Sequence, residues 1–164
     1  MGNILKINQT LKPYNKKIQI EGDKSLSIRW ALLASQALGK STALNILKSE
    51  DVLNTLECLK KLGVKVKTKK NRCEIFGLGL NGYKYEKKLT LNCGNSGTLG
   101  RLILGLLIHS NTEIKLIGDA SLSKRDFKRV IDPLKKFGAK FKTSSGKLPI
   151  TVKGTNNPKS IIYK

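Results

Sequence analysis

LKKLGVKVKT at residues 59–68 returns as LKKFGAKFKT at residues 134–143, with seven of ten positions identical. The two stretches are separated by 134 − 59 = 75 residues. An internal match of this kind predicts two copies of one structural unit. The period is longer than that of typical solenoid repeats, and it suits a compact mixed unit of helices and strands.

The residues around each match predict a helix that ends at a glycine and is followed by a strand. Apolar residues recur at helical spacing over 52–62 and 127–137. Gly63 and Gly138 then stand where a left-handed residue commonly ends a helix. Basic and apolar residues alternate directly afterwards, which is typical of a strand with one buried face.

Further elements precede each of these helices and complete a predicted βαβαββ unit. The first helix of each copy has few polar positions, so we expect it to be buried on most sides. The two units are expected to span about 15–80 and 88–154, and the rest of the chain to begin a third unit. The additional predicted elements are leading strands at 18–21 and 89–92, apolar helices at 27–38 and 97–109, short strands at 42–46 and 113–117, and a last strand at 149–153.

Composition excludes several other classes of protein. The longest apolar run, 102–108, is too short to cross a bilayer, and the first residues lack the layout of a secretory signal. We therefore expect a cytoplasmic protein with no membrane partner. Cys58, Cys73 and Cys93 are far apart and His109 is the single histidine, so we expect reduced, structural thiols and no metal site.

The charge pattern leaves one alternative function open. Thirty-two basic and 11 acidic residues give a net charge of +21, which favours an anionic partner. A basic nucleic-acid-binding module is therefore an alternative. However, the lysines are spread along the whole chain and aromatic residues make up only 5% of it, whereas such modules concentrate charge and interleave aromatic residues. A general compositional bias toward lysine is the favoured explanation.

Two predicted helices begin with residues suited to binding anions. The sequences are GDKSLSIR at 22–29 and CGNSGTLGR at 93–101. Helix starts present free N–H groups and the positive end of the helix dipole. Arg29 and Arg101 follow one turn later, with no acid three or four residues away, so a phosphate or carboxylate would be a natural partner. Alternatively, Ser25 or Ser27 is simply a helix cap, and the arginines reach solvent.

Three ordered segments resemble motifs of the 5-enolpyruvylshikimate-3-phosphate synthase family. Residues 22–29 are similar to its G-D-K-S-[IL]-S-H-R signature. Residues 94–98, followed by Arg101, resemble its G-N-[SA]-G-T-x-x-R segment, and GDASLSKR at 118–125 resembles its G-D-x-S-L-x-x-R-P segment. The similarity extends over essentially the whole chain.

The resemblance implies an α/β (α+β) fold in which βαβαββ units surround buried parallel helices, an incomplete inside-out α/β barrel. The family has two domains of three such units. Residues 1–14 would form a strand of the second domain, and residues 15–164 would belong to the first. The Ser-Ala-Gln segment of the family is expected just after Lys164 and the acid–base residues lie in the second domain. We therefore expect these 164 residues to be inactive alone. A half-domain that pairs with a separate chain is a further alternative.

The resemblance also implies an activity and a set of site residues. The family transfers the enolpyruvyl group of phosphoenolpyruvate to the 5-hydroxyl of shikimate 3-phosphate and releases phosphate, a step of aromatic amino-acid biosynthesis. The full-length enzyme is expected to be a monomer that binds these two small molecules, without cofactor or metal. The implied residues are Lys24, as catalytic residue and ligand of both substrates; Ser25 and Arg29 for shikimate 3-phosphate; Asn95, Gly97 and Arg125 for phosphoenolpyruvate; and Thr98 and Arg101 in support.

The chain departs from the family pattern at three positions. Ile28 replaces the usual histidine, Trp30 is unusual, and Asp126 replaces a proline. Our hypothesis for Asp126 is that its carboxylate pairs with Arg125 and raises the KM for phosphoenolpyruvate. An unchanged KM in an Asp126→Pro variant would contradict it.

Overall fold

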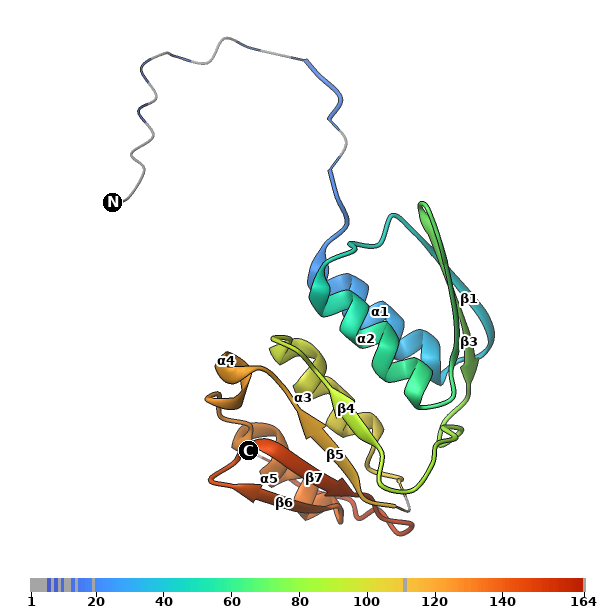
Figure 1. The fold of residues 1–164 in the computed structure, drawn as a ribbon, viewed down its shortest axis with the longest axis vertical. Helices are drawn as coiled ribbons and strands as arrows, with labels where there is room; N and C mark the ends of the chain where they lie inside the picture. The colour runs from blue at the N-terminus through green and yellow to red at the C-terminus, as the bar shows by residue number, and fades with distance from the viewer. Residues whose placement is uncertain are drawn as a thin grey trace.

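The computed structural model describes residues 6, 8, 10, 13, 15–18, 20–110 and 112–163. Helices are interspersed with single strands and hairpins along this part of the chain (Figure 1). The elements are α1 (Lys24–Gln36), β1 (Leu38–Leu44), α2 (Glu50–Lys61), β2 (Lys65–Lys69), β3 (Arg72–Leu78), β4 (Thr90–Asn92), α3 (Gly97–Leu106), β5 (Ile114–Ile117), α4 (Ala120–Ser123), α5 (Lys128–Phe137), β6 (Lys140–Ser144) and β7 (Lys147–Lys153).

The strands form two sheets whose topology repeats. The first has the order β1-β3-β2 and the second the order β4-β5-β7-β6. In the first sheet β3 pairs with β1 and with β2, and in the second sheet β7 pairs in the same way with β5 and with β6. All four pairs are antiparallel. β4 pairs in parallel with β5. The second copy is therefore the predicted βαβαββ unit, with the additional short helix α4.

The leading strand that we predicted at 18–21 is wrong. The described residues of this stretch form no strand, whereas the equivalent prediction at 89–92 is confirmed by β4. Ile18 and Ile20 are 75% and 74% exposed. The two isoleucine side chains therefore have no surface to pack against. A strand needs both a neighbouring strand and a buried face.

The two helices before the internal match end in the same way, as predicted. Gly63 has φ +86° and Gly138 has φ +117°. The N–H of Val64 donates to the carbonyl of Leu59, and that of Ala139 donates to the equivalent Leu134. This is the Schellman arrangement, which requires a left-handed residue that glycine adopts without strain.

The predicted boundaries of the apolar helices differ from those observed. α1 begins at Lys24 rather than near Ser27, because the side chain of Asp23 accepts the N–H of Leu26 at 2.7 Å and caps the helix. It ends at Gln36, and β1 begins at Leu38, four residues before the predicted strand. α3 ends at Leu106 rather than 109.

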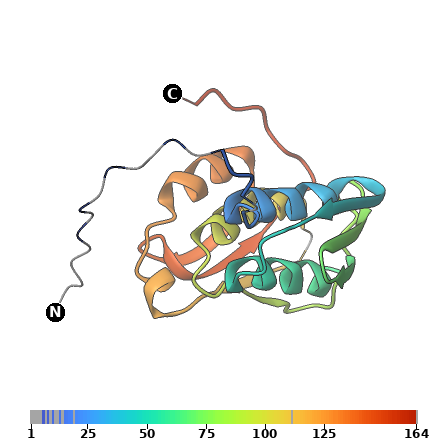
Figure 2. The same ribbon diagram turned by 90° about the horizontal axis from the view of Figure 1, so that it is seen from above.

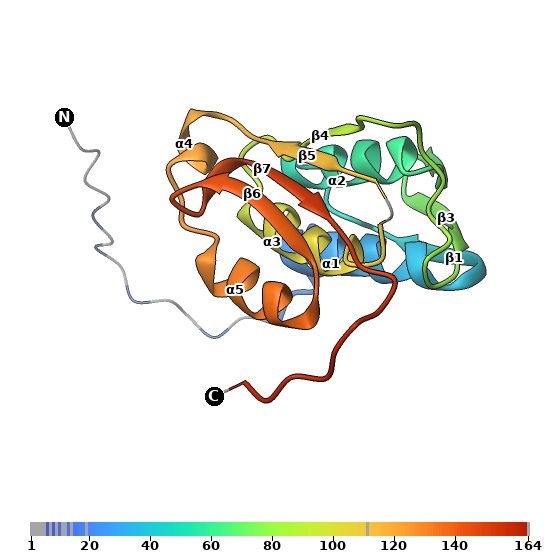
Figure 3. The same cartoon turned by 90° about the horizontal axis from the view of Figure 1, so that it is seen from below.

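Helices α1 and α3 lie side by side in the middle of the molecule (Figure 2). α2 packs beside α1, and α5 beside α3, with the sheets outside them (Figure 3). The apolar helices are only partly buried, contrary to our expectation. Leu33 is 70% exposed and Leu102 is 40% exposed. Both line an apolar hollow of about 270 Å³ with Arg29, Leu32 and Leu106, which we call the α1–α3 groove.

Two further findings concern membranes and metals. Over the described ranges, each helix is too short or too polar to cross a membrane. In the same part of the chain, no three side chains of His, Cys, Asp or Glu gather closely enough to hold a metal ion.

Candidate active site

The three sequence motifs gather at one end of the molecule, at the starts of α1, α3 and α4 (Figure 1). The first turns of α2 join two of them: Asp51 forms a salt bridge with Lys24, and Asn54 lies against Gly94, where a Cβ would approach its Nδ2 to 2.2 Å. The backbone N–H of Asp119 donates to the carbonyl of Gly94 at 2.9 Å, which attaches the third motif.

The start of α1 is fixed by hydrogen bonds of the motif itself. Asp23, rather than Ser25 or Ser27, is the N-cap. Ser27 is buried, and its Oγ donates to the carbonyl of Asp23 at 2.7 Å and accepts the N–H of Leu47 at 3.1 Å. The serine therefore attaches the segment after β1 to the helix start, which leaves Lys24 and Ser25 in the first turn.

The three residues implied for shikimate 3-phosphate have different surroundings. The side chain of Lys24 is 51% exposed, and its Nζ lies 3.0 Å from Oδ2 of Asp51. Ser25 is half-buried, whereas Arg29 is exposed at the edge of the α1–α3 groove. Ile28, at the position of the family's histidine, is fully buried. It packs in the core and therefore takes no part in the surface of the site.

The start of α3 is flanked by two guanidinium groups. Ser96 caps the helix by accepting the N–H of Leu99 at 3.2 Å. A Cβ on Gly97 would lie 2.8 Å from Nη1 of Arg101 and 3.0 Å from Nη1 of Arg125. Two cationic groups and the free N–H groups of the first turn therefore surround one buried glycine, an arrangement that suits an anion.

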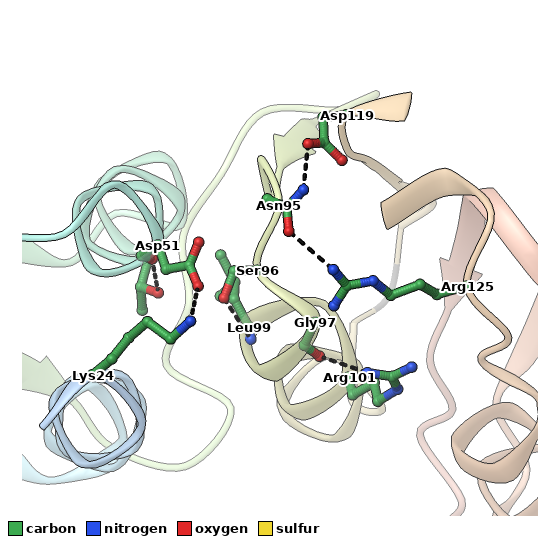
Figure 4. Close-up of polar contacts among 10 residues, drawn as sticks. Lys24, Asp51, Asn95, Ser96, Gly97, Leu99, Arg101, Asp119 and Arg125 are labelled. Carbon is green, nitrogen blue, oxygen red and sulfur yellow. Dashed lines mark hydrogen bonds and ion pairs between the residues drawn. The ribbon is translucent and has the colours of Figure 1, made fainter. Parts of the chain in front are cut away.

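Hydrogen bonds connect Asn95 to two residues of the third motif, Asp119 and Arg125 (Figure 4). Its Nδ2 donates to Oδ2 of Asp119 at 2.5 Å, and its Oδ1 accepts from Nη2 of Arg125 at 3.0 Å. The side chain of Asp119 also accepts the N–H of Leu122 at 2.6 Å. The pKa of Asp119 is held below its usual value, first by this backbone hydrogen bond and then by that from Asn95.

Arg101 is held over the side of α3. Its Nη1 donates to the carbonyl of Gly97 at 3.4 Å, its Nη2 donates to the carbonyl of Asp126 at 3.1 Å, and its Cζ lies 5.1 Å from the ring centre of Phe127. Its Nε is buried without a hydrogen-bond partner among the described residues. Burial and then the charges of Arg129 and Arg125 lower the pKa of Arg101, which a bound anion would counteract.

Asp126 has a different partner from the one we hypothesised. Its Oδ1 accepts the backbone N–H of Lys128 at 2.6 Å, at the start of α5. The guanidinium of Arg125 instead donates to Asn95. The carboxylate of Asp126 therefore stabilises the turn before α5. The proline of the family pattern would instead restrict the backbone at this position.

The structure brings together most of the predicted site residues and adds two that we had not assigned. Asn95, Gly97, Arg101 and Arg125 surround the start of α3, and Thr98 lies in its first turn. Lys24 lies beside α2. Asp51 and Asp119 were missed as partners of Lys24 and Asn95. The Gly-Asp pair of the third motif was a signal for Asp119, whereas the pairing of Asp51 depends on how α2 packs beside α1.

Comparison with known proteins identifies the family of the chain. The family model EPSP synthase (3-phosphoshikimate 1-carboxyvinyltransferase) matches residues 8–164. The chain is 44% identical over 146 residues to the 3-phosphoshikimate 1-carboxyvinyltransferase of Vesicomyosocius okutanii, covering 89% of this chain and 33% of that protein. It is 38% identical over 161 residues to the enzyme of that name from Streptococcus pyogenes serotype M4, covering 97% of this chain and 38% of that protein.

A solved structure of EPSP synthase from Acinetobacter baumannii has a TM-score of 0.84 and 35% identity, covering 90% of this chain and 34% of that one. The chain thus spans about a third of the length of the relatives that it matches. These matches confirm the predicted family resemblance and fold class. Because the likeness holds in sequence and in three dimensions over about nine-tenths of its residues, the chain belongs to the EPSP synthase family.

Proposed function

We propose that this chain contributes the first domain of an enzyme that transfers the enolpyruvyl group of phosphoenolpyruvate to the 5-hydroxyl of shikimate 3-phosphate. The observation that carries the proposal is the pair of guanidinium groups, Arg101 and Arg125, against the first residue of α3. Both substrates are polyanions, and planar guanidinium groups bind phosphates and carboxylates in bidentate fashion. The names of the matched relatives describe the same activity.

The site residues divide between the two substrates. Phosphoenolpyruvate would lie at the start of α3, with Arg125 and the amide of Asn95 as its side-chain ligands and Gly97 leaving room for it. Shikimate 3-phosphate would lie at the start of α1, with Ser25 and Arg29. The remaining members are Lys24, between both substrates, and Thr98 and Arg101, which support the loop before α3.

Lys24 is the proposed catalytic residue of this chain. The reaction forms a bond between the 5-hydroxyl oxygen, which loses its proton, and the central carbon of the enol, while the methylene carbon gains a proton. The C–O bond to phosphate then breaks, and the methyl group loses a proton to restore the double bond. In the structure the ammonium group pairs with Asp51 at 3.0 Å. We expect it to exchange this partner for the substrate phosphate and to offset the charge of the departing phosphate.

We further propose a domain organisation for these residues. Residues 15–164 would form a first domain, with units at about 15–80 and 88–154 and the beginning of a third, and residues 1–14 a strand of another domain. That strand falls mainly outside the described residues. The α1–α3 groove favours the presence of a further unit. Its exposed leucines could pack against an apolar helix of that unit, on this chain or on a separate one. A cytoplasmic location and a monomeric full-length enzyme are part of the same proposal.

A phosphate-release assay with both substrates tests the proposed activity. We expect no release from the 164 residues alone. We expect release when a second chain supplies the remaining two thirds of the Vesicomyosocius okutanii relative. In that mixture Lys24→Ala or Arg125→Ala should lower kcat/KM by about a hundredfold or more. Lys87→Ala, an exposed lysine outside the site, is the control. Turnover that is insensitive to both site substitutions would contradict the assignment.

The charge of +21 favours a second candidate function, binding to nucleic acid. Fluorescence anisotropy with a labelled duplex of random sequence measures it. A steep loss of affinity with salt and no competition by shikimate 3-phosphate would support this candidate. Displacement of the duplex by shikimate 3-phosphate would favour the enzyme, because the anion sites would then be shared.

A further inference from the structure

A second cavity lies outside the candidate active site. It has a volume of about 440 Å³ and lies between the first turns of α2, the segment 45–48 and the hairpin of β2 and β3. Its volume is within the range of about 300–1,000 Å³ that is common for small-molecule sites. None of the residues assigned above to either substrate lines it.

The floor of this cavity is apolar and partly open to solvent. Val52 and Leu56, from one face of α2, are buried, as is Cys73 of β3. Leu53 lines the same cavity and is 48% exposed. An exposed leucine in a hollow loses its contact with water only when another apolar group covers it, so the floor favours a ligand with an apolar body.

The rim is strongly cationic. Lys48, Lys69 and Lys70 line it and are exposed, and within the described part of the chain no carboxylate lies at salt-bridge distance from any of them. Arg72 also lines the cavity, paired with Glu74 at 2.9 Å. Four cationic side chains thus face a single lining carboxylate, that of Glu21.

We propose that this cavity binds a small free carboxylate with an apolar body, of about the size of octanoate. Its carboxylate would lie among the ammonium groups of Lys48, Lys69 and Lys70, and its body over Leu53 and Leu56. The lysines of the rim call for an anionic group, and the leucines of the floor call for an apolar body, so the ligand must have both. A simple anion leaves the leucines uncovered, and a neutral alcohol leaves the lysines unpaired. The site is independent of the proposed enolpyruvyl transfer.

Chemical-shift mapping by NMR with octanoate tests the proposal on the 164-residue chain. We expect saturable shifts at the amides of 45–48, 52–56 and 69–73. Acetate supplies the same anion without the body, and 1-octanol the same body without the anion. Each should bind at least about fivefold more weakly than octanoate, since each leaves one half of the cavity unfilled.

A matched pair of double variants separates the local lysines from the overall charge. Lys69→Gln with Lys70→Gln should weaken octanoate binding by about fivefold to tenfold. Lys135→Gln with Lys136→Gln makes the same charge change on α5 and should leave it unchanged. Dispersed amide spectra show that both variants are folded.

Four outcomes would overturn the proposal. These are no shifts at millimolar octanoate, shifts confined to Leu33, Leu102 and Leu106 of the α1–α3 groove, equal affinity for 1-octanol, or equal weakening in the two double variants. The outcome that supports it is octanoate binding at the cavity that the local lysines alone control.

Discussion

Nζ of Lys24 and Oδ2 of Asp51 are 3.0 Å apart, which ties the proposed catalytic lysine on α1 to the first turn of α2. Asn54, one turn further along α2, lies against Gly94 of the second motif. A Cβ on Gly94 would overlap the side-chain amide of Asn54, and Gly94 has φ +54°. α2 therefore contacts the starts of both α1 and α3, and none of the proposed substrate ligands lies on it.

A double-mutant cycle with Lys24→Met and Asp51→Asn should give a coupling free energy of about 0.5–1 kcal/mol in urea unfolding. The side chain of Asp51 is only 17% exposed, so solvent screens the pair less than an ordinary surface pair. The control is Lys142 with Glu113, whose side chains are 76% and 49% exposed at a shorter distance of 2.6 Å. A coupling in the control as large as that of Lys24 with Asp51 would contradict this argument.

Gly97→Ala should weaken phosphoenolpyruvate binding by about tenfold while leaving shikimate 3-phosphate binding nearly unchanged. The new Cβ would push the Nη1 atoms of Arg101 and Arg125, 2.8 and 3.0 Å away, out of the proposed anion site. Both are ends of flexible side chains, so the fold should persist. The measurement is the KM for each substrate in the two-chain assay.

Gly105→Ala is the matched control in the same helix. A Cβ there meets nothing within 4 Å, so this variant should keep both KM values and gain about 0.5–1 kcal/mol of stability from helix propensity. If Gly97→Ala raised the KM for both substrates equally, the division of the site between the two helix starts would be wrong.

The sequence predicted the repeated unit well because its signals are local. The glycines that end α2 and α5 and the alternation after them depend on neighbours within a few residues. The strand at 18–21 failed for the opposite reason. Ile18 and Ile20 have the alternation of a strand, but a strand also requires a partner edge, and pairing is decided by residues far away in the chain.

Asp119→Asn should reduce stability at neutral pH and have a smaller effect in acid. The pKa of Asp119 is lowered in the folded protein from its ordinary value of 3.8. Its contribution is therefore fully present above that ordinary value and is lost as the pH falls through the lowered one. Unfolding of both proteins in urea at several pH values between about 6 and 2 measures the difference.

The same series in an Asn95→Ala background separates the two causes. The N–H of Leu122 is the larger cause of the lowered pKa, and the amide of Asn95 the smaller. The pH dependence should therefore weaken but persist. Its complete loss would mean that Asn95, rather than the helix cap, controls this carboxylate.

The candidate site was predictable only in part. Asn95, Gly97 and Arg125 were implied by the motifs, and they do meet at the start of α3. That Asp51 would pair with Lys24 depends on how α2 packs beside α1, which no local pattern encodes. The partner of Asp126 was equally inaccessible, because a carboxylate next to an arginine in sequence can instead accept a backbone N–H two residues later.

Gly63→Ala should destabilise the chain more than Gly138→Ala, although both glycines end equivalent helices. The left-handed conformation alone costs alanine about 1–2 kcal/mol at either position. At Gly63 the new Cβ would lie 2.5 Å from the backbone carbonyl oxygen of Lys84, whose N–H donates to Leu62. At Gly138 the nearest atom is a side-chain methyl of Thr155 at 3.1 Å.

Urea unfolding of the two variants gives the comparison. We expect about 1–2 kcal/mol for Gly138→Ala and at least about 1 kcal/mol more for Gly63→Ala, since a side chain can move and a hydrogen-bonded backbone cannot. Equal losses would show that the segment around Lys84 shifts freely, and that the chain between the two units is held less firmly than its hydrogen bond indicates.

Leu33→Glu with Leu102→Glu should reduce self-association of the 164-residue chain. Both leucines are exposed and line the α1–α3 groove, and an exposed apolar hollow on two central helices favours contact with another apolar surface. Sedimentation velocity over a range of concentrations measures the effect. Ile18→Glu with Ile162→Glu introduces the same charges at positions that are 75% and 92% exposed outside the groove, and should not change sedimentation.

The groove variant should also fail to activate the second chain in the phosphate-release assay, because a further unit would no longer pack there. Normal activity in that mixture would place the further unit elsewhere.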